Sequence, residues 1–373
     1  MLGNELRYVQ EAFESGWITP LGPFVTRFEN DVCEYVGAKS AVALSSGTAA
    51  IHLALREAGI MKNDIVFCPS MTFAASANPI VYEGATPVFI DSEKDTFNMS
   101  PVALRKAFEK YKAKAVVLVH LYGTPAHMDE IVAICKENGA ALIEDATEAL
   151  GATYKGKMAG TFGDYGTYSF NGNKMITTAG GGMIVSNHRE SAEHARFASM
   201  QAKEPCRYYY HKEIGFNYRM SNICAAIGVG QLEKIDELLS IKKRIFDRYN
   251  ASIDAKYAKM LEYYGQRKPN YWLSVMMLDD DAPVTAEEVI DELARNNIDA
   301  RHVWYPLHKQ PIYEGCDFVK EVDGEESNAE YLLRCGICLP SDTNMSEEEQ
   351  DTVISVINSY IDKMNWLLRH QGY

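Results

Sequence analysis

The sequence predicts an α/β protein with two parts: a large domain built on a mostly parallel central sheet, and a smaller α/β domain at the C-terminal end. Three observations lead to this fold class. Short apolar runs alternate with helix-like stretches through the first two thirds of the chain, several runs are apolar at consecutive positions, and the pattern changes after residue 230. Alternating strands and helices indicate a parallel sheet covered by helices, and unbroken apolar runs are typical of strands buried on both faces.

The apolar runs are expected to form the strands of the large sheet. They span residues 41–44, 64–70, 86–91, 113–120, 140–145, 166–170 and 181–186. Helix-like stretches lie between the early runs, at 48–58, 74–82, 101–110 and 128–138. Ligands of such sheets bind beyond the carboxyl ends of the strands, so a site is expected in the segments that follow the runs.

The pattern after residue 230 predicts a separate unit. A long amphipathic helix is expected over 231–257, followed by a charged loop at 262–270. Strands are then expected at 271–278 and 299–306, a helix at 285–297 between them, and a last helix at 346–368. We therefore predict a large domain over 1–235 and a smaller C-terminal domain over 236–373.

The charge and hydropathy of the chain exclude several classes of partner. The 373 residues include 51 acidic and 37 basic side chains, for a net charge of −14. Nucleic-acid binding requires clustered basic surface, and the short basic run at 242–244 is instead typical of a solvated helix face. The apolar run at 115–119 is far too short to span a membrane, and residues 1–17 lack the apolar core of a signal peptide. We expect a cytoplasmic protein without nucleic-acid or membrane partners.

The cysteines do not indicate a metal site or a disulfide framework. Eight are scattered along the chain, which fits a reducing compartment. Cys335 and Cys338 form one CxxC pair, but a structural zinc site needs four ligands and no second pair lies nearby. We expect buried small side chains here and no metal.

The first motif with chemical content is Ser45-Ser46-Gly47-Thr48. It follows the run at 41–44 and precedes a helix. Free N–H groups at a helix N-terminus, close backbone approach at Gly47 and the Thr48 hydroxyl all suit a phosphate. A serine or threonine before a helix is more often a simple N-cap, so this motif alone does not establish a phosphate site.

Two further motifs combine with the first. Asp145 ends an apolar run, where a carboxylate must be compensated by a partner such as a protonated ring nitrogen, a helix N-terminus or a salt bridge. Lys174 lies in a polar turn before the glycines at 180–182, and Ser169 lies five positions before it. A lysine in a turn is usually solvated, yet a desolvated lysine is also the residue that forms a Schiff base with a carbonyl cofactor.

In this order and spacing, the three motifs resemble those of the fold-type I pyridoxal-phosphate (PLP)-dependent transferases, the aspartate aminotransferase-like enzymes. Longer phrases resemble the DegT/DnrJ/StrS-type nucleotide-sugar aminotransferases over nearly the whole chain. They include SSGTAAIHLAL, LIEDATEALGATYKGKMAGTFGDYGTYSF, NKMITTAGGGM, GFNYRMSNICAAIGVGQL and RHVWYPLH. The resemblance implies the same fold, the cofactor pyridoxal 5′-phosphate and transaminase activity.

The resemblance also implies roles for residues around the cofactor ring. Lys174 matches the Schiff-base lysine, which also moves the proton as general base and acid. Asp145 matches the carboxylate that faces the pyridine nitrogen, and Glu148 matches a position near the ring hydroxyl where many relatives have Gln. Phe73 matches an aromatic side chain that stacks on the ring, although plain core packing is the alternative for such a residue.

Other implied roles concern the phosphate, the substrate and a second subunit. The phosphate cup matches Gly47, Thr48 and Ala49, with Ser169 adding a hydroxyl. Asn217 matches a residue that reaches the partner's phosphate, which implies a homodimer with active sites at its interface. The implied substrate-binding residues of the C-terminal domain are Arg301 and His308.

Within the family, SFNGNK, TTAGGGM and EDATEALG resemble the 4-aminotransferases of the UDP-N,N′-diacetylbacillosamine pathway. That resemblance implies transfer of the amino group of L-glutamate to the C4 keto group of a UDP-4-keto-6-deoxy-N-acetylhexosamine. A dTDP- or GDP-linked sugar, a 3-keto sugar and a non-catalytic regulator on the same fold remain alternatives. Sugar dehydratases on this fold have His in place of the lysine, so Lys174 argues against that activity. Relatives usually have residues before the GNE at 3–5, so the sequence leaves open whether the N-terminus is trimmed.

Overall fold

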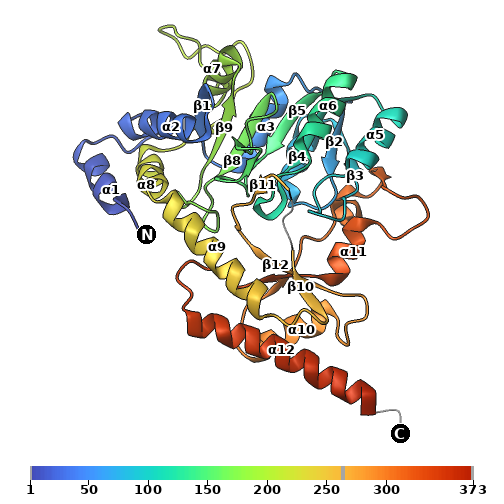
Figure 1. Ribbon diagram of the computed structural model, residues 1–373. Coiled ribbons are helices and arrows are strands. Elements are labelled where there is room, and N and C mark those ends of the chain that lie inside the picture. Colours follow the sequence, from blue (N-terminus) through green and yellow to red (C-terminus); the bar gives the residue numbers. More distant parts are fainter. Residues whose placement is uncertain (1, 262–264, 371–373) are drawn as a thin grey trace.

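The large sheet contains eight strands in the computed structural model, which describes residues 2–261 and 265–370 (Figure 1). They are β1 (Ser40–Leu44), β2 (Ile65–Pro69), β3 (Thr86–Ile90), β4 (Ala113–Val119), β5 (Ala141–Asp145), β8 (Tyr165–Ser169), β9 (Gly182–Ser186) and β14 (Phe318–Val319). Their order is β1-β9-β8-β5-β4-β2-β3-β14. Only β9 is antiparallel to its neighbours, so the predicted mostly parallel sheet is confirmed.

Helices cover both faces of this sheet because successive side chains of each strand point to opposite faces. In β4, for example, Ala115 and Val117 join one core cluster, whereas Val116 and Leu118 join another. The first face packs against α3 (Gly47–Glu57), α4 (Asn78–Tyr82) and α7 (Arg189–Ala198). The second packs against α2 (Pro23–Val36), α5 (Pro101–Lys110), α6 (Met128–Asn138) and α8 (Asn222–Leu232), and α1 (Glu5–Glu14) lies outside on α8.

A second, antiparallel sheet forms the centre of the C-terminal part. It contains β10 (Ala258–Met260), β12 (Ser274–Leu278), β15 (Gly336–Leu339) and β13 (Arg301–His302), in that order. It packs against α9 (Ile235–Ser252), α10 (Ala286–Arg295) and α12 (Glu347–His370). In Figure 1, α9 runs from the large domain down to this sheet, and α12 lies along its outer side.

The remaining short elements connect the two parts. A small sheet joins β11 (Arg267–Lys268), β6 (Thr153–Tyr154) and β7 (Lys157–Met158). The helix α11 (Asn328–Cys335) leads into β15, and 3-10 turns lie at Ala74–Ser76, Leu121–Gly123, Leu307–Lys309 and Pro311–Tyr313. Because β14 pairs with β3, chain beyond residue 236 completes the large sheet, and the domain division at 235/236 stays a prediction.

Several expected elements differ from those observed. The helix expected over 231–257 is interrupted at Glu233 and Lys234, where the Glu233 carboxylate accepts hydrogen bonds from Tyr8 and Asn4 of the N-terminal segment. The helix expected over 74–82 is divided at Ala77, ahead of a proline at the start of α4.

The strand expected over 299–306 is much shorter than predicted. It is reduced to Arg301–His302, because the Trp304 N–H bonds to the hydroxyl of Tyr122 instead of to a strand. Residues 262–264 of the expected charged loop lie outside the described residues. No helix in the described ranges is long and apolar enough to cross a membrane.

Candidate functional site

A cavity of about 330 Å³ lies where the strands of the large sheet end, as expected for a parallel sheet. Its wall combines the ends of β1, β5 and β8 with the turn around Lys174 and two tryptophans of the C-terminal part. Of the predicted site residues, the structure brings Gly47, Thr48, Phe73, Asp145, Glu148, Ser169 and Lys174 together in this wall. Ala49, Asn217, Arg301 and His308 do not line it.

The N-terminus of α3 forms one end of the cavity. The Ser46 hydroxyl caps this helix by accepting the Ala49 N–H at 3.1 Å, so this N–H of the expected phosphate cup is engaged in the cap. Gly47 is tightly enclosed: a Cβ there would lie 3.0 Å from Cβ of Ser169. At Gly182 an added Cβ would lie 2.2 Å from the Ser46 carbonyl oxygen, so glycine allows β9 to approach this turn. The result is a narrow cup of helix N–H groups and hydroxyls, which suits a phosphate.

The buried carboxylate of Asp145 is held in place by two hydrogen bonds. One carboxylate oxygen accepts the Ser76 hydroxyl at 2.6 Å, and the other accepts the Thr147 N–H at 3.1 Å. Ser76 is in turn 2.8 Å from the Thr72 hydroxyl. These bonds fix the orientation of the carboxylate at the end of β5, where it can face a protonated ring nitrogen.

The Lys174 amine points at an aromatic ring. Its Nζ lies 4.0 Å from the centroid of Trp272, and that indole is anchored by its own N–H, which donates to the Asn173 carbonyl at 2.7 Å. Within the described chain, Nζ has no hydrogen bond or ion pair closer than this contact. Burial lowers the pKa of Lys174, while the charges of Glu148 and Asp145 oppose that effect. A desolvated amine without a direct counter-ion suits a nucleophile.

Glu148 and two aromatic side chains complete the wall. The Glu148 carboxylate accepts the Tyr122 N–H at 2.7 Å, and burial raises its pKa to about 7, against the lowering influence of the Lys174 charge. The ring of Phe73, more than half exposed, lies 5.3 Å from that of Trp304. These two rings offer an apolar surface for a flat ligand.

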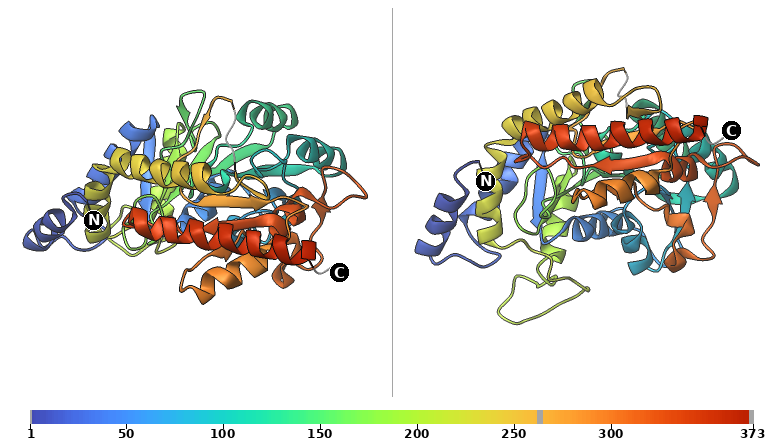
Figure 2. Two further views of the ribbon diagram at one scale, coloured as in Figure 1. Left: turned by 60° about the horizontal axis from the view of Figure 1, so that its bottom comes forward. Right: turned by 90° about the horizontal axis from the view of Figure 1, so that it is seen from below.

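Two of the predicted residues, Asn217 and Arg301, lie outside the cavity. Asn217 pairs with Met200 at the base of a segment with exposed tyrosines at 208–210, the yellow-green loop that projects from the body in Figure 2. Arg301 lies in an adjoining cavity of about 470 Å³ and pairs with Asp299 at 3.2 Å. Their implied roles toward partner and substrate stay predictions.

His308 packs inside the protein instead of facing the cavity. Its ring stacks on Phe318 with centroids 3.8 Å apart, and its Nδ1 lies 2.6 Å from the Ser70 hydroxyl. Burial lowers the pKa of His308 to about 4. The family role at the substrate stays a prediction, although these contacts are those of a packed side chain.

Sequence reasoning missed the side chains that position the reactive ones. Ser76 holds Asp145 from a different strand connection, and Trp272 and Trp304 come from the C-terminal part. Trp304 stands in RHVWYPLH, which carried a family resemblance, so this phrase was a usable signal. Nothing local to Ser76 or Trp272 marked them.

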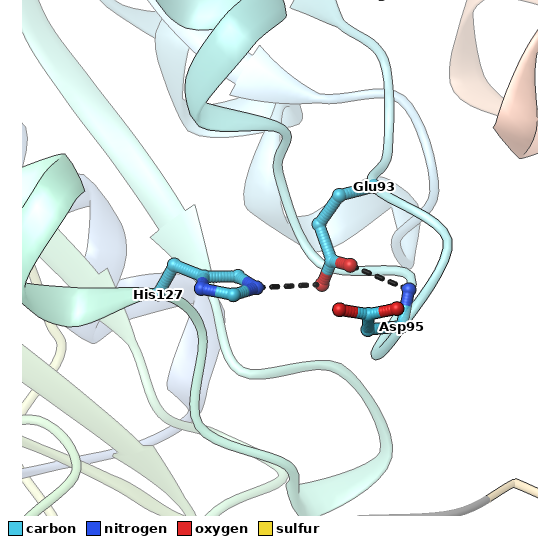
Figure 3. Close-up of side chains that lie close together, drawn as sticks. All are labelled: Glu93, Asp95 and His127. Atoms are coloured by element: carbon cyan, nitrogen blue, oxygen red, sulfur yellow. Dashed lines mark hydrogen bonds and ion pairs between the residues drawn. The ribbon is translucent and has the colours of Figure 1, made fainter. Parts of the chain in front are cut away.

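A second cluster of titratable side chains lies outside the cavity (Figure 3). Ligand atoms of Glu93, Asp95 and His127 lie within 4.8 Å of one another. The Glu93 carboxylate already accepts the Asp95 N–H at 2.6 Å and both the N–H and the hydroxyl of Thr96, while His127 Nε2 lies 3.7 Å away. These donors come from the same loop as Glu93, so we interpret the Glu93 carboxylate as a structural group that stabilises the loop.

The residues of the cavity fit pyridoxal 5′-phosphate. The N-terminal cup of α3 with Ser169 suits its phosphate, Asp145 suits its ring nitrogen, and Lys174 suits its aldehyde. The buried indole N–H of Trp304, unlike its backbone N–H, has no hydrogen-bond partner among the described residues, so the cavity wall also offers a donor. Each group of this cofactor thus meets a side chain or helix end of matching chemistry.

Comparisons with known proteins identify the family of the chain. The model of the DegT/DnrJ/EryC1/StrS aminotransferase family matches residues 2–358. The pyridoxal phosphate-dependent aminotransferase EpsN of Bacillus subtilis is 50% identical over 96% of this chain and 93% of its own length, and the GDP-perosamine synthase of Escherichia coli O157:H7 is 40% identical over 97% of each. A DegT DnrJ EryC1 StrS aminotransferase from Brucella abortus has a similar structure, with a TM-score of 0.87, 28% identity and coverage of 96% and 95% of the two chains.

Proposed function

This chain belongs to the DegT/DnrJ/EryC1/StrS aminotransferase family with pyridoxal 5′-phosphate as its cofactor, and on that premise we propose that it aminates a nucleotide-linked keto sugar. The amino donor is L-glutamate, and the acceptor is the C4 keto group of a UDP-4-keto-6-deoxy-N-acetylhexosamine. The product serves the biosynthesis of a surface polysaccharide or glycan. The observation that carries the proposal is the Lys174 amine, desolvated over Trp272 in the same cavity as the strand-end carboxylate of Asp145.

The side chains divide the work of such a transfer. When bound, the cofactor supplies an electron sink and carries the amino group between the two substrates. Lys174 would hold the cofactor through its amine, and the same amine would accept and return the proton at the reacting carbon. Asp145, held by Ser76, keeps a proton on the ring nitrogen. Phe73 and Trp304 cover the cavity with apolar surface that limits access of water.

The nucleotide of the acceptor has one specific rival. Phrases around Lys174 favour a UDP-linked sugar through their resemblance to the bacillosamine-type enzymes, whereas three curated relatives at 35% to 40% identity are GDP-perosamine synthases. A GDP-linked sugar is therefore the second candidate. The adjoining cavity with Arg301 shares Trp272 and Trp304 with the first, and offers room for the remainder of either substrate.

We further propose a homodimer that acts in the cytoplasm. Asn217 lies at the base of the projecting segment, away from its own cavity, which fits a residue that serves the site of a second copy. All eight cysteines are unpaired, which fits a reducing compartment.

Turnover with matched acceptors tests the substrate proposal. The purified protein with pyridoxal 5′-phosphate and L-glutamate is offered the same 4-keto-6-deoxy sugar linked to UDP, GDP or dTDP, and 2-oxoglutarate is measured. We expect the largest kcat/KM with the UDP-linked N-acetylated sugar. A preference for the GDP-linked sugar would change the assigned substrate and keep the aminotransferase chemistry. If glutamate releases 2-oxoglutarate but none of the three sugars acts as acceptor, this substrate class is excluded.

A further inference from the structure

The cavity contains more acid than its one lysine can neutralise. Two carboxylates, those of Asp145 and Glu148, share a pocket with a single amine, that of Lys174. Both residues are almost fully buried: 2% of the surface of Asp145 and 4% of the surface of Glu148 is exposed. Since a buried charge without its own counter-ion is costly, one of the two carboxylates is favoured to take up a proton.

The hydrogen bonds identify which one. Asp145 receives a hydroxyl at 2.6 Å and a backbone N–H at 3.1 Å, so both of its oxygens have a donor. Glu148 has one donor within hydrogen-bond distance, the Tyr122 N–H at 2.7 Å, and the nearby indole N–H of Trp304 only weakly favours the charged form of Glu148. Glu148, the carboxylate with fewer donors, is therefore the natural site of the proton.

The backbone of Tyr122, which donates to Glu148, has a strained conformation. Tyr122 has a φ of +52°, a left-handed conformation that a bulky side chain rarely adopts. This conformation directs the Tyr122 N–H to the Glu148 carboxylate, while the Tyr122 hydroxyl accepts the backbone N–H of Trp304 at 2.8 Å. A strained residue that aims a donor at a cavity side chain marks a position where geometry matters to function.

We propose that Glu148 gains and loses a proton around neutral pH in the cofactor-free site, and that this proton controls the charge of Lys174. When Glu148 is neutral, nothing but Asp145 attracts positive charge to the amine, and the amine is more readily nucleophilic. When Glu148 ionises, its charge holds the proton on Lys174. Glu148 is thus a positioning residue that acts through the lysine, and this role goes beyond the proposed sugar substrate.

Two of the four other ionisable groups around Glu148 stay neutral near pH 7. The four are Lys174 and Asp145 in the cavity, Tyr122 beside it, and Cys338 on β15. Burial raises the pKa of the Tyr122 phenol well above its usual range and that of the Cys338 thiol to about 12. Both stay neutral near pH 7, whereas burial brings the pKa of Glu148 to about 7, so titration of this site is that of Glu148 coupled to Lys174.

Two measurements on the cofactor-free protein test the proposal. The first follows acetylation of Lys174 by acetic anhydride across the pH range, read by mass spectrometry of its peptide, in the wild type and in Glu148→Gln. The variant lacks the charge that retains the lysine proton, so above about pH 8 we expect its Lys174 to react about tenfold faster than in the wild type. Below about pH 6 the two rates converge, because the wild-type Glu148 is then neutral too. A rate ratio independent of pH, or no difference at any pH, would overturn the proposal.

The second measurement can overturn the proposal on the wild type alone, which guards against a variant that fails to fold, and two variants then assign the band. Infrared difference spectra of glutamate-labelled wild type between about pH 6 and about pH 8.5 are expected to show the carbonyl stretch of a buried carboxylic acid that disappears at the higher pH. If Glu148→Gln folds, it lacks this band, and Glu93→Gln, a matched buried glutamate outside the cavity, retains it. Absence of the band from the wild type overturns the proposal. Neither readout depends on turnover, so a wrong sugar substrate would leave both results unaffected.

Discussion

Two clusters of ionisable side chains in this protein contain the same types of residue but differ in how their charges are compensated. Each combines two carboxylates with one basic side chain: Asp145, Glu148 and Lys174 in the cavity, and Glu93, Asp95 and His127 on the surface (Figure 3). The surface cluster is built within one loop and the start of α6, and backbone N–H groups two and three residues away saturate Glu93. The cavity cluster is assembled from two separate segments, the end of β5 with the residues after it and the turn between β8 and β9, and its amine meets an aromatic ring instead of a carboxylate.

The difference shows what makes a group of ionisable side chains reactive. Local donors satisfy a carboxylate and leave it with a structural role. In the cavity, burial works against the charges of both Glu148 and Lys174, and no neighbour fully compensates them. Residue types alone do not separate the two clusters, but the supply of donors does.

The largest effect is expected from Lys174→Ala. This change removes the only amine of the cavity wall, so turnover should fall by about 10⁴-fold or more, while folding is retained because the side chain makes no hydrogen bond that supports the fold. Turnover and circular dichroism are measured on the same preparation. A folded variant that keeps more than about a tenth of the activity would place the reactive amine elsewhere.

A smaller loss is expected from Asp145→Asn. An amide cannot keep a proton on the ring nitrogen, and removal of a fixed charge of this kind costs about 10² to 10³ in kcat. Asp91→Asn is the matched control, because Asp91 is also buried after a strand end but accepts backbone N–H groups of Ser92 and Ala329. The control should lose stability and retain kcat. Equal loss of kcat in both variants would mean that Asp145 is structural.

His308 is expected to affect stability through its proton. Its pKa is lowered by burial to about 4, so the unfolded chain binds a proton that the folded one does not as the pH falls below about 6.5. The stability that His308 contributes is therefore present above that pH and is lost on acidification, by roughly 2 kcal/mol between about pH 6.5 and about pH 5. Urea unfolding of wild type and His308→Gln at several pH values measures this. A constant difference between them, with a raised KM for the sugar, would favour the substrate role.

The smallest effect is expected from Glu93→Gln. Loss of charge in the loop should cost about 1 kcal/mol of unfolding free energy and leave kcat unchanged, because the loop lies outside the cavity. Addition of Mn²⁺, Zn²⁺ or Mg²⁺ should not raise the thermal midpoint. A thermal midpoint that metal raises in the wild type but not in the variant would identify the surface cluster as a metal site and contradict its structural role.

Much of the large domain and of the reactive set could be predicted from the sequence. Runs of consecutive apolar residues located the strands, and the residues at their ends, such as Asp145 and Ser169, then fell at one edge of the sheet. The supporting side chains could not be predicted, because Ser76, Trp272 and Trp304 reach the cavity only through tertiary packing. The same holds for the break at Glu233, where a contact with α1 overrides a helical pattern.

The visible spectrum of the protein tests the central claim most directly. After pyridoxal 5′-phosphate is bound, L-glutamate and then the UDP-linked 4-keto-6-deoxy-N-acetylhexosamine are added in turn. We predict an absorption band of the bound cofactor that glutamate bleaches and the keto sugar restores, and that Lys174→Ala does not form. A wild-type protein that folds and binds the cofactor, yet shows no such band and no response to glutamate, would contradict the assignment of Lys174 and the proposed aminotransferase activity.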